Sequence, residues 1–356
     1  MMEYYSLDDF RKLPKFDAHL HYHTYYDLFI RHAKKANMRL MSINTNFDFV
    51  SMDKQHEIAQ HFHQRYPYFF DYIGTFDASS FASKTFVHDT VEQIKKCMTA
   101  GARGIKIWKN IGMKIKNEAG EYLMADDPVF DPIYAFLDKE QIPLLVHLGE
   151  PRNCWLPIER MSVTSDQHYF HKMPEFHAWR QPEIPSYEQQ MTARDHILER
   201  FPNMIFIGAH LSSMEWNLDE VAKRLDKFPN FYIDISGRFA HIMEQTLRNR
   251  SAVIHFFETY KDRIIYGSDF FVSEDDRSYL MNLFFKCLPR IFMRLLSIYA
   301  GRAVKRQWLF FATDQLFKTE NIISNSDLPK QIQGLKLSKN TIDRIFYKNA
   351  CSIYFR

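Results

Sequence analysis

The chain has 356 residues, of which 46% are apolar and 25% are charged, a composition typical of a folded globular protein and not of a disordered one. The formal net charge of +3 is too small to predict a nucleic-acid-binding protein. Glycines number only 11, and neither GxGxxG nor GxxxxGK[ST] occurs, so we expect no phosphate-cradling nucleotide site. The four cysteines form no CxxC pair, which is typical of a reducing compartment.

The chain shows no targeting or membrane-spanning pattern. Residues 1–15 are polar and charged, without the apolar segment of a secretory signal, so we expect a cytoplasmic protein. The apolar stretch 279–311 contains six Lys and Arg residues, too many for a segment that spans a bilayer. This stretch is either a basic amphipathic helix on a membrane surface or helices packed on the protein itself. We favour the second and expect no membrane partner.

Short runs rich in Ile, Val, Phe and Tyr alternate with longer segments of helical period. In chain order, the expected strands are Phe16–His21, Arg39–Asn44, Tyr72–Phe76, Gly104–Trp108, Pro143–His147, Ile205–His210, Phe231–Ser236 and Ile264–Asp269. The clearest expected helices between them are Asp53–Gln64, Thr90–Ala100, Pro132–Glu140, Pro185–Arg200 and Leu218–Lys227. Eight strands alternating with helices predict an α/β fold, a (β/α)₈ barrel, with a doubly wound sheet as the alternative.

Two segments are longer than a connection requires. No Pro/Gly/Ser-rich linker marks a boundary, so we expect one domain over residues 1–356 with insertions at about 148–185 and 270–337. These insertions follow the fifth and eighth strands, at the barrel face where loops build active sites. Arg152 and Trp179 in the first insertion are therefore candidates for contacting a substrate.

The first strand carries two histidines one strand period apart. Alternation places His19 and His21 on one face and Ala18 and Leu20 on the other, and we expect His23 on the loop that follows. Two imidazoles on one face can bind a divalent ion. The alternative is a pair of surface or hydrogen-bonded histidines.

Three further strands end in residues of metal-ligand type. The fifth ends at His147, the sixth at His210 and the eighth at Asp269. The ends of parallel barrel strands meet at one mouth, so these side chains are expected to converge with the histidine pair. Nitrogen and carboxylate ligands suit Zn²⁺, with Fe²⁺, Mn²⁺ and Co²⁺ as alternatives.

Two basic residues are expected near the same mouth. In the fourth strand, alternation puts Lys106 inside the barrel, where it must be paired, neutral or modified, or else at the rim in solvent. Asp234, Ser236 and Arg238 follow the inward face of the seventh strand. Arg238 is either a residue that binds an anionic substrate or part of a structural ion pair.

The order of these residues resembles the amidohydrolase superfamily of TIM-barrel metal hydrolases. More narrowly, it resembles the amidohydrolase-related branch, which includes predicted metal-dependent hydrolases and decarboxylases of the aminocarboxymuconate-semialdehyde type. The similar segments are FDAHLH (16–21), GARGIKIWKN (101–110), LLVHLGEP (144–151), FPNMIFIGAHL (201–211), FPNFYIDISGR (228–238), DRIIYGSDF (262–270) and IFYKNACSIY (345–354). One departure is the long, basic segment 270–337, so the resemblance implies no particular substrate.

The resemblance implies a role for each candidate residue. His19 and His21 would hold a first metal ion, with Asp269 as a ligand that also takes the proton of the attacking water. His147 and His210 would bind a second ion, or the same ion in one-metal members, where they also orient substrate. Lys106 would either be carbamylated and bridge two metals or, unmodified, bind a substrate carboxylate.

We therefore expect a divalent-metal-dependent hydrolase that uses a metal-activated water to cleave an amide, lactone or ester bond of a small molecule. Asp269 is the expected base, with His210 as the second catalytic candidate. The rivals are a metal-dependent decarboxylase on the same scaffold and a non-catalytic small-molecule-binding barrel. We also expect one or two metal ions per chain, no nucleic-acid partner and possible homo-oligomerisation.

Overall fold

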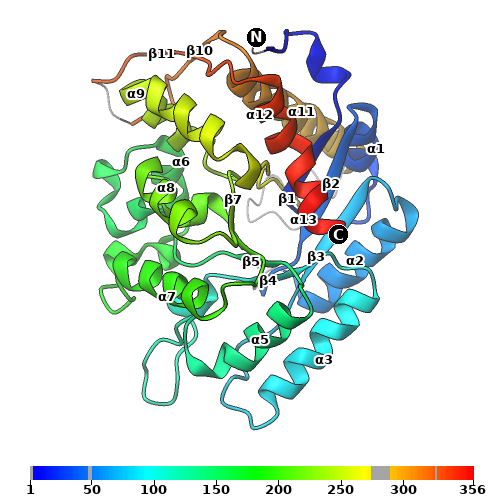
Figure 1. Ribbon diagram of the computed structural model, residues 1–356, viewed down its shortest axis with the longest axis vertical. Coiled ribbons are helices and arrows are strands. Elements are labelled where there is room, and N and C mark those ends of the chain that lie inside the picture. The colour runs from blue at the N-terminus through cyan, green and yellow to red at the C-terminus, as the bar shows by residue number, and fades with distance from the viewer. Residues whose placement is uncertain (1–2, 47–49, 274–288, 325–326) are drawn as a thin grey trace.

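The structure, a computed structural model, describes residues 3–46, 50–273, 289–324 and 327–356. Nine strands form one sheet in which every neighbouring pair is parallel, in the order β8-β7-β6-β5-β4-β3-β2-β1-β9 (Figure 1). Their bounds are β1 Lys15–His23, β2 Met38–Ile43, β3 Phe70–Thr75, β4 Ile105–Ile107, β5 Leu144–Val146, β6 Phe206–Gly208, β7 Phe231–Asp234, β8 Ile264–Ile265 and β9 Phe271–Ser273.

The two ends of this sheet lie side by side. The segment after β8 is joined to β1 by backbone hydrogen bonds from Ala18 N to Tyr266 O (3.1 Å), from Asp269 N to His19 O (2.8 Å) and from His21 N to Phe270 O (2.8 Å). The first eight strands follow one another around the sheet in chain order, whereas a doubly wound sheet reverses its strand order at a switch point. The fold is therefore the predicted (β/α)₈ barrel.

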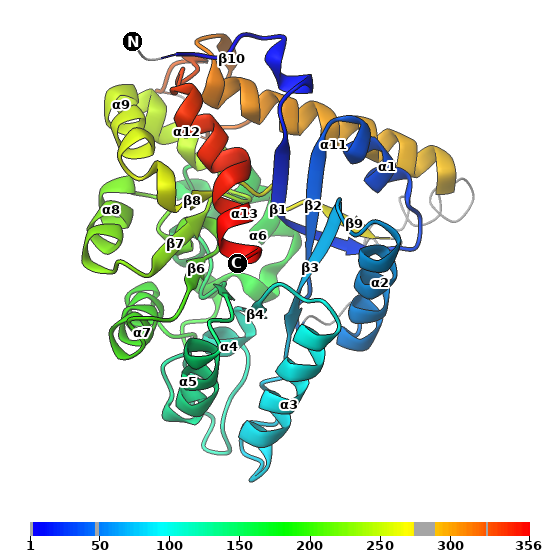
Figure 2. The ribbon, with the colours of Figure 1, turned by 45° about the vertical axis from the view of Figure 1, so that its right-hand side comes forward.

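Helices surround the strands, as Figures 1 and 2 show. The main ones are α1 Leu28–Lys35, α2 Met52–Arg65, α3 Phe86–Thr99, α5 Asp131–Lys139, α7 Tyr187–Arg200, α8 Leu218–Lys227 and α9 Phe239–Thr259. All five helices expected from the sequence form within a few residues of their predicted bounds. At the start of α7, Ser186 and Gln189 form a reciprocal capping box, which satisfies backbone N–H groups that the first turn leaves unpaired.

The remaining elements belong to the two insertions and the C-terminus. The short α4 Asn110–Met113 lies between β4 and α5. The first insertion follows β5 and contains α6 Thr164–Lys172. The second insertion contains α11 Pro289–Ala312 and the antiparallel pair β10 Leu316–Lys318 and β11 Gln331–Gln333. The chain ends with α12 Lys339–Asp343 and α13 Asn349–Tyr354.

The barrel interior is apolar and is closed by α13. Inward side chains of the strands form a buried cluster with residues of that helix: Phe16, Ala18, Met41, Ile43, Ile73, Leu145, Ile205, Ile207, Ala209, Ile265, Ala350, Ile353 and Tyr354. A second, larger cluster packs the outer faces of the strands against the helices. The interior cluster leaves the carboxyl ends of the strands to polar side chains.

An irregularity in β1 changes which residues face inward. The pairing of β1 with β2 shifts register between Asp17 and Leu20. Ala18 consequently lies in the interior cluster and Leu20 in the outer one, which corrects the expectation that both share a face. A second correction concerns the strand end, because β1 continues to His23, which is buried and not on a loop.

The second insertion was expected to pack on the protein itself. Its residues 289–312 form α11, which lies against α1, whereas residues 279–288 of the expected apolar stretch lie outside the described residues. Within the described ranges, no helix is both long enough and apolar enough to cross a membrane.

Candidate metal centre

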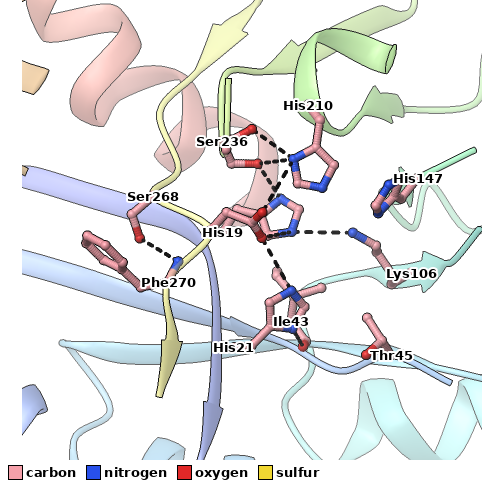
Figure 3. A network of polar contacts seen from close by, with 12 residues as sticks. His19, His21, Ile43, Thr45, Lys106, His147, His210, Ser236, Ser268 and Phe270 are labelled. Carbon is pink, nitrogen blue, oxygen red and sulfur yellow. Dashed lines mark hydrogen bonds and ion pairs between the residues drawn. The ribbon is translucent and has the colours of Figure 1, made fainter. Parts of the chain in front are cut away.

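The five predicted ligands converge at the carboxyl ends of the barrel strands, and Figure 3 shows the four histidines among them. His19, His210 and Asp269 each offer one ligand atom, and these three atoms lie within 4.8 Å of one another. The Nε2 atom of His21 lies 3.6 Å from Asp269 Oδ1, and the ring centres of His147 and His210 are 4.4 Å apart. Side chains from four different strands or strand ends thus form one cluster.

The hydrogen bonds of three imidazoles fix which nitrogen faces the cluster. His19 Nδ1 lies 2.7 Å from the Asp234 carboxylate, His21 Nδ1 lies 2.9 Å from the Ile43 carbonyl, and His210 Nδ1 lies 2.8 Å from the Ser236 carbonyl. A carbonyl or carboxylate oxygen only accepts, so Nδ1 must carry the proton in each neutral ring. The Nε2 lone pair of all three rings is therefore available to a metal ion, an arrangement typical of metal-binding histidines.

Burial favours the neutral form of His19, His147 and His210. It lowers the pKa of His147 and of His210 well below the ordinary value, and burial together with nearby Lys106 lowers the pKa of His19. Burial opposes the charge of Asp234, but the contact with His19 outweighs it and holds the pKa of this carboxyl below its usual range. Neutral imidazoles and ionised carboxylates are the states that bind divalent metals.

The backbone is strained at two of the clustered residues. His210 and Asp269 have φ angles of +60° and +61°, in the left-handed region that residues other than glycine rarely adopt. Leu211, Ser212 and Ser213 continue this conformation after His210. Such strain costs about 1–3 kcal/mol per residue and concentrates at functional sites, where it fixes the direction of side chains.

Lys106 lies inside the barrel, as strand alternation predicts. Its side chain is buried, and Nζ is 3.4 Å from His19 Nε2 (Figure 3). Burial lowers the pKa of this amine to about 8. Part of the amine is therefore neutral near physiological pH, the form that carbamylation requires.

A cavity of about 360 Å³ opens directly above the cluster. Its lining residues are His21, Thr45, Trp108, Lys109, His147, Glu150, Pro151, Ser165, Asp166, Tyr169, His210, Gly237, Arg238, Asp269 and Phe271. One wall comes from the first insertion. Its residues Glu150 and Tyr169 accept hydrogen bonds from Lys109, which follows β4. Four of the five candidate ligands, His21, His147, His210 and Asp269, therefore line a space suited to a small molecule.

Arg238 is a buried cation on the wall of this cavity. It is 8% exposed, and its Nε atom has no hydrogen-bond partner among the described residues. A buried donor without a partner is costly in a folded protein, so it indicates a group that binds a ligand. The Nε2 atom of His147 is likewise buried without a hydrogen-bond partner in the part of the chain that the structure describes.

Two residues predicted to contact substrate lie elsewhere. Arg152 does not line the cavity, because its guanidinium stacks 4.1 Å from the ring centre of Trp216 on the side of a different hollow. Trp179 is 56% exposed and is also absent from the lining. From the first insertion, α6 presents Asp166 and Tyr169 to the cavity instead.

The residues present fit a divalent ion. Three imidazoles offer unprotonated Nε2 atoms, a fourth has an unpartnered Nε2, and Asp269 supplies a carboxylate. This donor set is typical of Zn²⁺ and of other divalent transition metals.

A parallel barrel with such donors at the carboxyl ends of its strands has the architecture of metal-dependent TIM-barrel enzymes. Residues 80–356, more than half of the chain, match the family described as amidohydrolase, and the chain belongs to this family. His19 and His21 precede the matched residues, so their place in the site comes from the structure. No curated protein matches the chain in sequence.

Solved structures share the fold over nearly the whole chain. An uncharacterized TIM-barrel protein from Bordetella bronchiseptica is 14% identical with a TM-score of 0.53, covering 97% of this chain and 100% of that one. The 2,6-dihydroxybenzoate decarboxylase from Rhizobium is 13% identical with a TM-score of 0.51, covering 96% of this chain and 98% of that one. At these identities the similarity shows the fold alone.

Proposed function

We propose that this protein is a divalent-metal-dependent hydrolase that cleaves an amide, lactone or ester bond of a small molecule. The observation that carries the proposal is the gathering of four imidazoles around Asp269, three of them with Nδ1 held by oxygen acceptors, beneath a cavity of about 360 Å³. The buried Nε2 of His147 has no hydrogen-bond partner among the described residues, which supports a bound ligand at this place.

Each residue then has a distinct part in the reaction. The four histidines and Asp269 would hold the ion, which when bound would supply Lewis acidity that activates water near neutral pH. Asp269 takes the proton of the attacking water, because its carboxylate both faces the cavity and contacts the imidazoles of the cluster. Asp234 and the Ile43 carbonyl orient His19 and His21 through their Nδ1 atoms.

Basic residues on the wall suit a substrate with an anionic group. Arg238 lines the cavity, its Nε–H has no hydrogen-bond partner among the described residues, and a guanidinium binds carboxylates in a fixed geometry. Lys106 lies at the floor, where an unmodified amine would contact the reacting end of the substrate. We favour this unmodified state over a carbamylated, metal-bridging one.

The second candidate function is a metal-dependent decarboxylase. Arg238 favours it too, because a carboxylate held by this guanidinium could be the group that leaves as CO₂. One of the solved structures with this fold is a decarboxylase. The two functions differ in their consumption of water.

The test is incubation of the metal-loaded protein with a panel of lactones, amides, esters and unsaturated carboxylic acids, followed by mass spectrometry of the products. A lactone product heavier by one water, or two fragments whose summed mass exceeds that of an amide or ester by one water, supports hydrolysis. A product lighter by one CO₂ supports the decarboxylase. Turnover of neither kind, in a protein shown to contain its metal, would favour the non-catalytic binding barrel.

A further inference from the structure

The outer face of α11 exposes large apolar side chains. Ile291, Leu295, Ile298 and Tyr299 are 48%, 55%, 40% and 65% exposed. Their spacing of three, four, seven and eight residues places them along one stripe of the helix. A contiguous stripe of this kind, unlike single exposed apolar residues, indicates an interaction surface.

The same face is strongly basic. Five exposed cations accompany the stripe, and α11 contains no acidic residue: Arg290, Arg294, Arg302, Lys305 and Arg306. The neighbouring α1, which lies beside α11 in Figure 2, adds exposed basic side chains and also contains no acidic residue. We call the four apolar residues and the five cations of α11 the basic stripe.

The position of the basic stripe is fixed by packing. The opposite side of α11 buries Phe292, Met293, Val304 and Trp308 in the protein core, so the helix cannot rotate to hide its outer face. Tyr299 extends the stripe toward the active site, because its ring centre lies 6.3 Å from that of Phe270, the residue after Asp269. The stripe thus continues toward the strand segment that bounds the cavity.

We infer that the basic stripe docks on an anionic lipid bilayer surface. Its cations would pair with lipid phosphate and carboxylate groups while the apolar side chains enter the boundary between headgroups and acyl chains. A second copy fits poorly, because a two-fold contact through this face would bring two sets of five cations together. A nucleic acid would use the cations but would leave the exposed aliphatic side chains in water.

The inference departs from the sequence interpretation, which favoured packing on the protein over a membrane surface and expected no membrane partner. One side of α11 packs on the barrel, and its other side retains the features of a surface-binding helix. The inference is independent of the chemistry proposed for the cavity.

Cosedimentation of the full-length protein with vesicles tests the inference. We expect binding to phosphatidylcholine vesicles that contain phosphatidylserine, weak binding to pure phosphatidylcholine, and weakening by salt. Each cation near such a surface strengthens binding by about fivefold, so Arg294→Glu with Lys305→Glu should lower the partition coefficient at least ~10-fold. Ile291→Asn with Leu295→Asn should lower it as well, without changing the charge.

The matched control is Lys95→Glu with Lys96→Glu, which makes the same charge change on exposed positions of α3. The inference is overturned if wild-type protein does not bind the anionic vesicles, or if the control loses as much binding as the α11 variant. Unchanged binding of the Ile291/Leu295 variant would also overturn it, because a purely ionic surface would then suffice. The inference is also overturned if the wild type is a dimer that binds no vesicles and the Ile291/Leu295 variant is a monomer. That result would assign the face to a second copy.

Discussion

His19 Nδ1 lies 2.7 Å from Oδ2 of Asp234, a contact between two buried side chains that are 215 residues apart in the chain. The carboxylate ends β7 and the imidazole lies on β1, so closure of the barrel is needed to bring them together. Because Asp234 holds the proton on Nδ1, it determines that Nε2 faces the metal centre. We therefore regard Asp234 as a positioning residue.

Asp234→Asn should weaken metal binding while the barrel stays folded. The amide can donate as well as accept, so it no longer selects the Nδ1-protonated ring, and loss of such partners typically lowers metal affinity ~10–100-fold. Competition with a chromophoric chelator measures the affinity. Asp226→Asn is the control, because Asp226 accepts a hydrogen bond from Tyr260 on the exposed surface. Equal affinities in Asp234→Asn and wild type would remove Asp234 from the site.

The pair on β1 should account for bound metal. We expect one or two divalent ions per wild-type chain, and His19→Ala with His21→Ala should release the ion held by that pair. The chain offers a matched control in a second His-x-His sequence, since His61 and His63 on α2 diverge, toward Tyr25 and toward the Phe70 carbonyl respectively. Elemental analysis decides. Wild-type metal content in the β1 double variant would contradict the assignment.

Much of this site could be predicted from sequence because a parallel barrel brings the carboxyl ends of its strands together at one mouth. Apolar runs locate the strands, and polar residues at their ends, such as His147 and His210, must meet at one mouth. Asp234 carried the same signal, at the end of the seventh strand, but its role depends on a hydrogen bond to a distant strand. The geometry of that bond is set by tertiary packing and not by local pattern.

Other features had no local signal. The register shift that separates Ala18 from Leu20 arises from pairing with β2, so alternation along β1 alone could not reveal it. Tyr169 reaches the cavity only because α6 folds back over the barrel. Arg152 contacts the ring of Trp216, and its position in an insertion could not show whether it faces a substrate or an aromatic ring.

Asp269→Asn separates catalysis from folding. If Asp269 takes the proton of the attacking water, the variant should lose ~10²–10⁴-fold in kcat on any substrate found by the panel, because an amide cannot act as the base. Thermal unfolding should show a folded barrel, and metal content should be measured alongside, since Asp269 is also a ligand. Asp314→Asn, which alters a surface pair with Lys336, is the control. A near-normal kcat would make His210 the next candidate base.

Lys106→Ala distinguishes the two states of this lysine. For the unmodified amine that we favour, the variant should raise KM and leave the metal count unchanged, because Nζ contacts substrate and not the ion. For a carbamylated lysine, the count should fall from two ions to one, and a short carboxylic acid in the medium should restore it. Metal counts on variant and wild type, measured side by side, decide between these outcomes.

Glu215 should make stability depend on pH outside the metal centre. This carboxyl is buried, its Oε1 accepts a hydrogen bond from the Arg152 backbone N–H (2.8 Å), and burial raises its pKa to about 6. An unfolded glutamate titrates near ~4.3, so between these pH values the folded state binds more protons than the unfolded state. The free energy of unfolding should therefore fall as pH rises through this window, by roughly 2 kcal/mol in all.

Glu215→Gln should remove this fall, because the amide keeps the acceptor for the Arg152 N–H and carries no charge at any pH. Relative to wild type, the variant should gain stability steadily from about pH 4 to about pH 7. Urea unfolding of both proteins at several pH values gives the difference, in which the other titrating groups cancel. Glu118→Gln on the exposed surface is the matched control and should show a flat difference. A flat difference for Glu215→Gln as well would mean that the buried carboxyl titrates as it does in the unfolded chain.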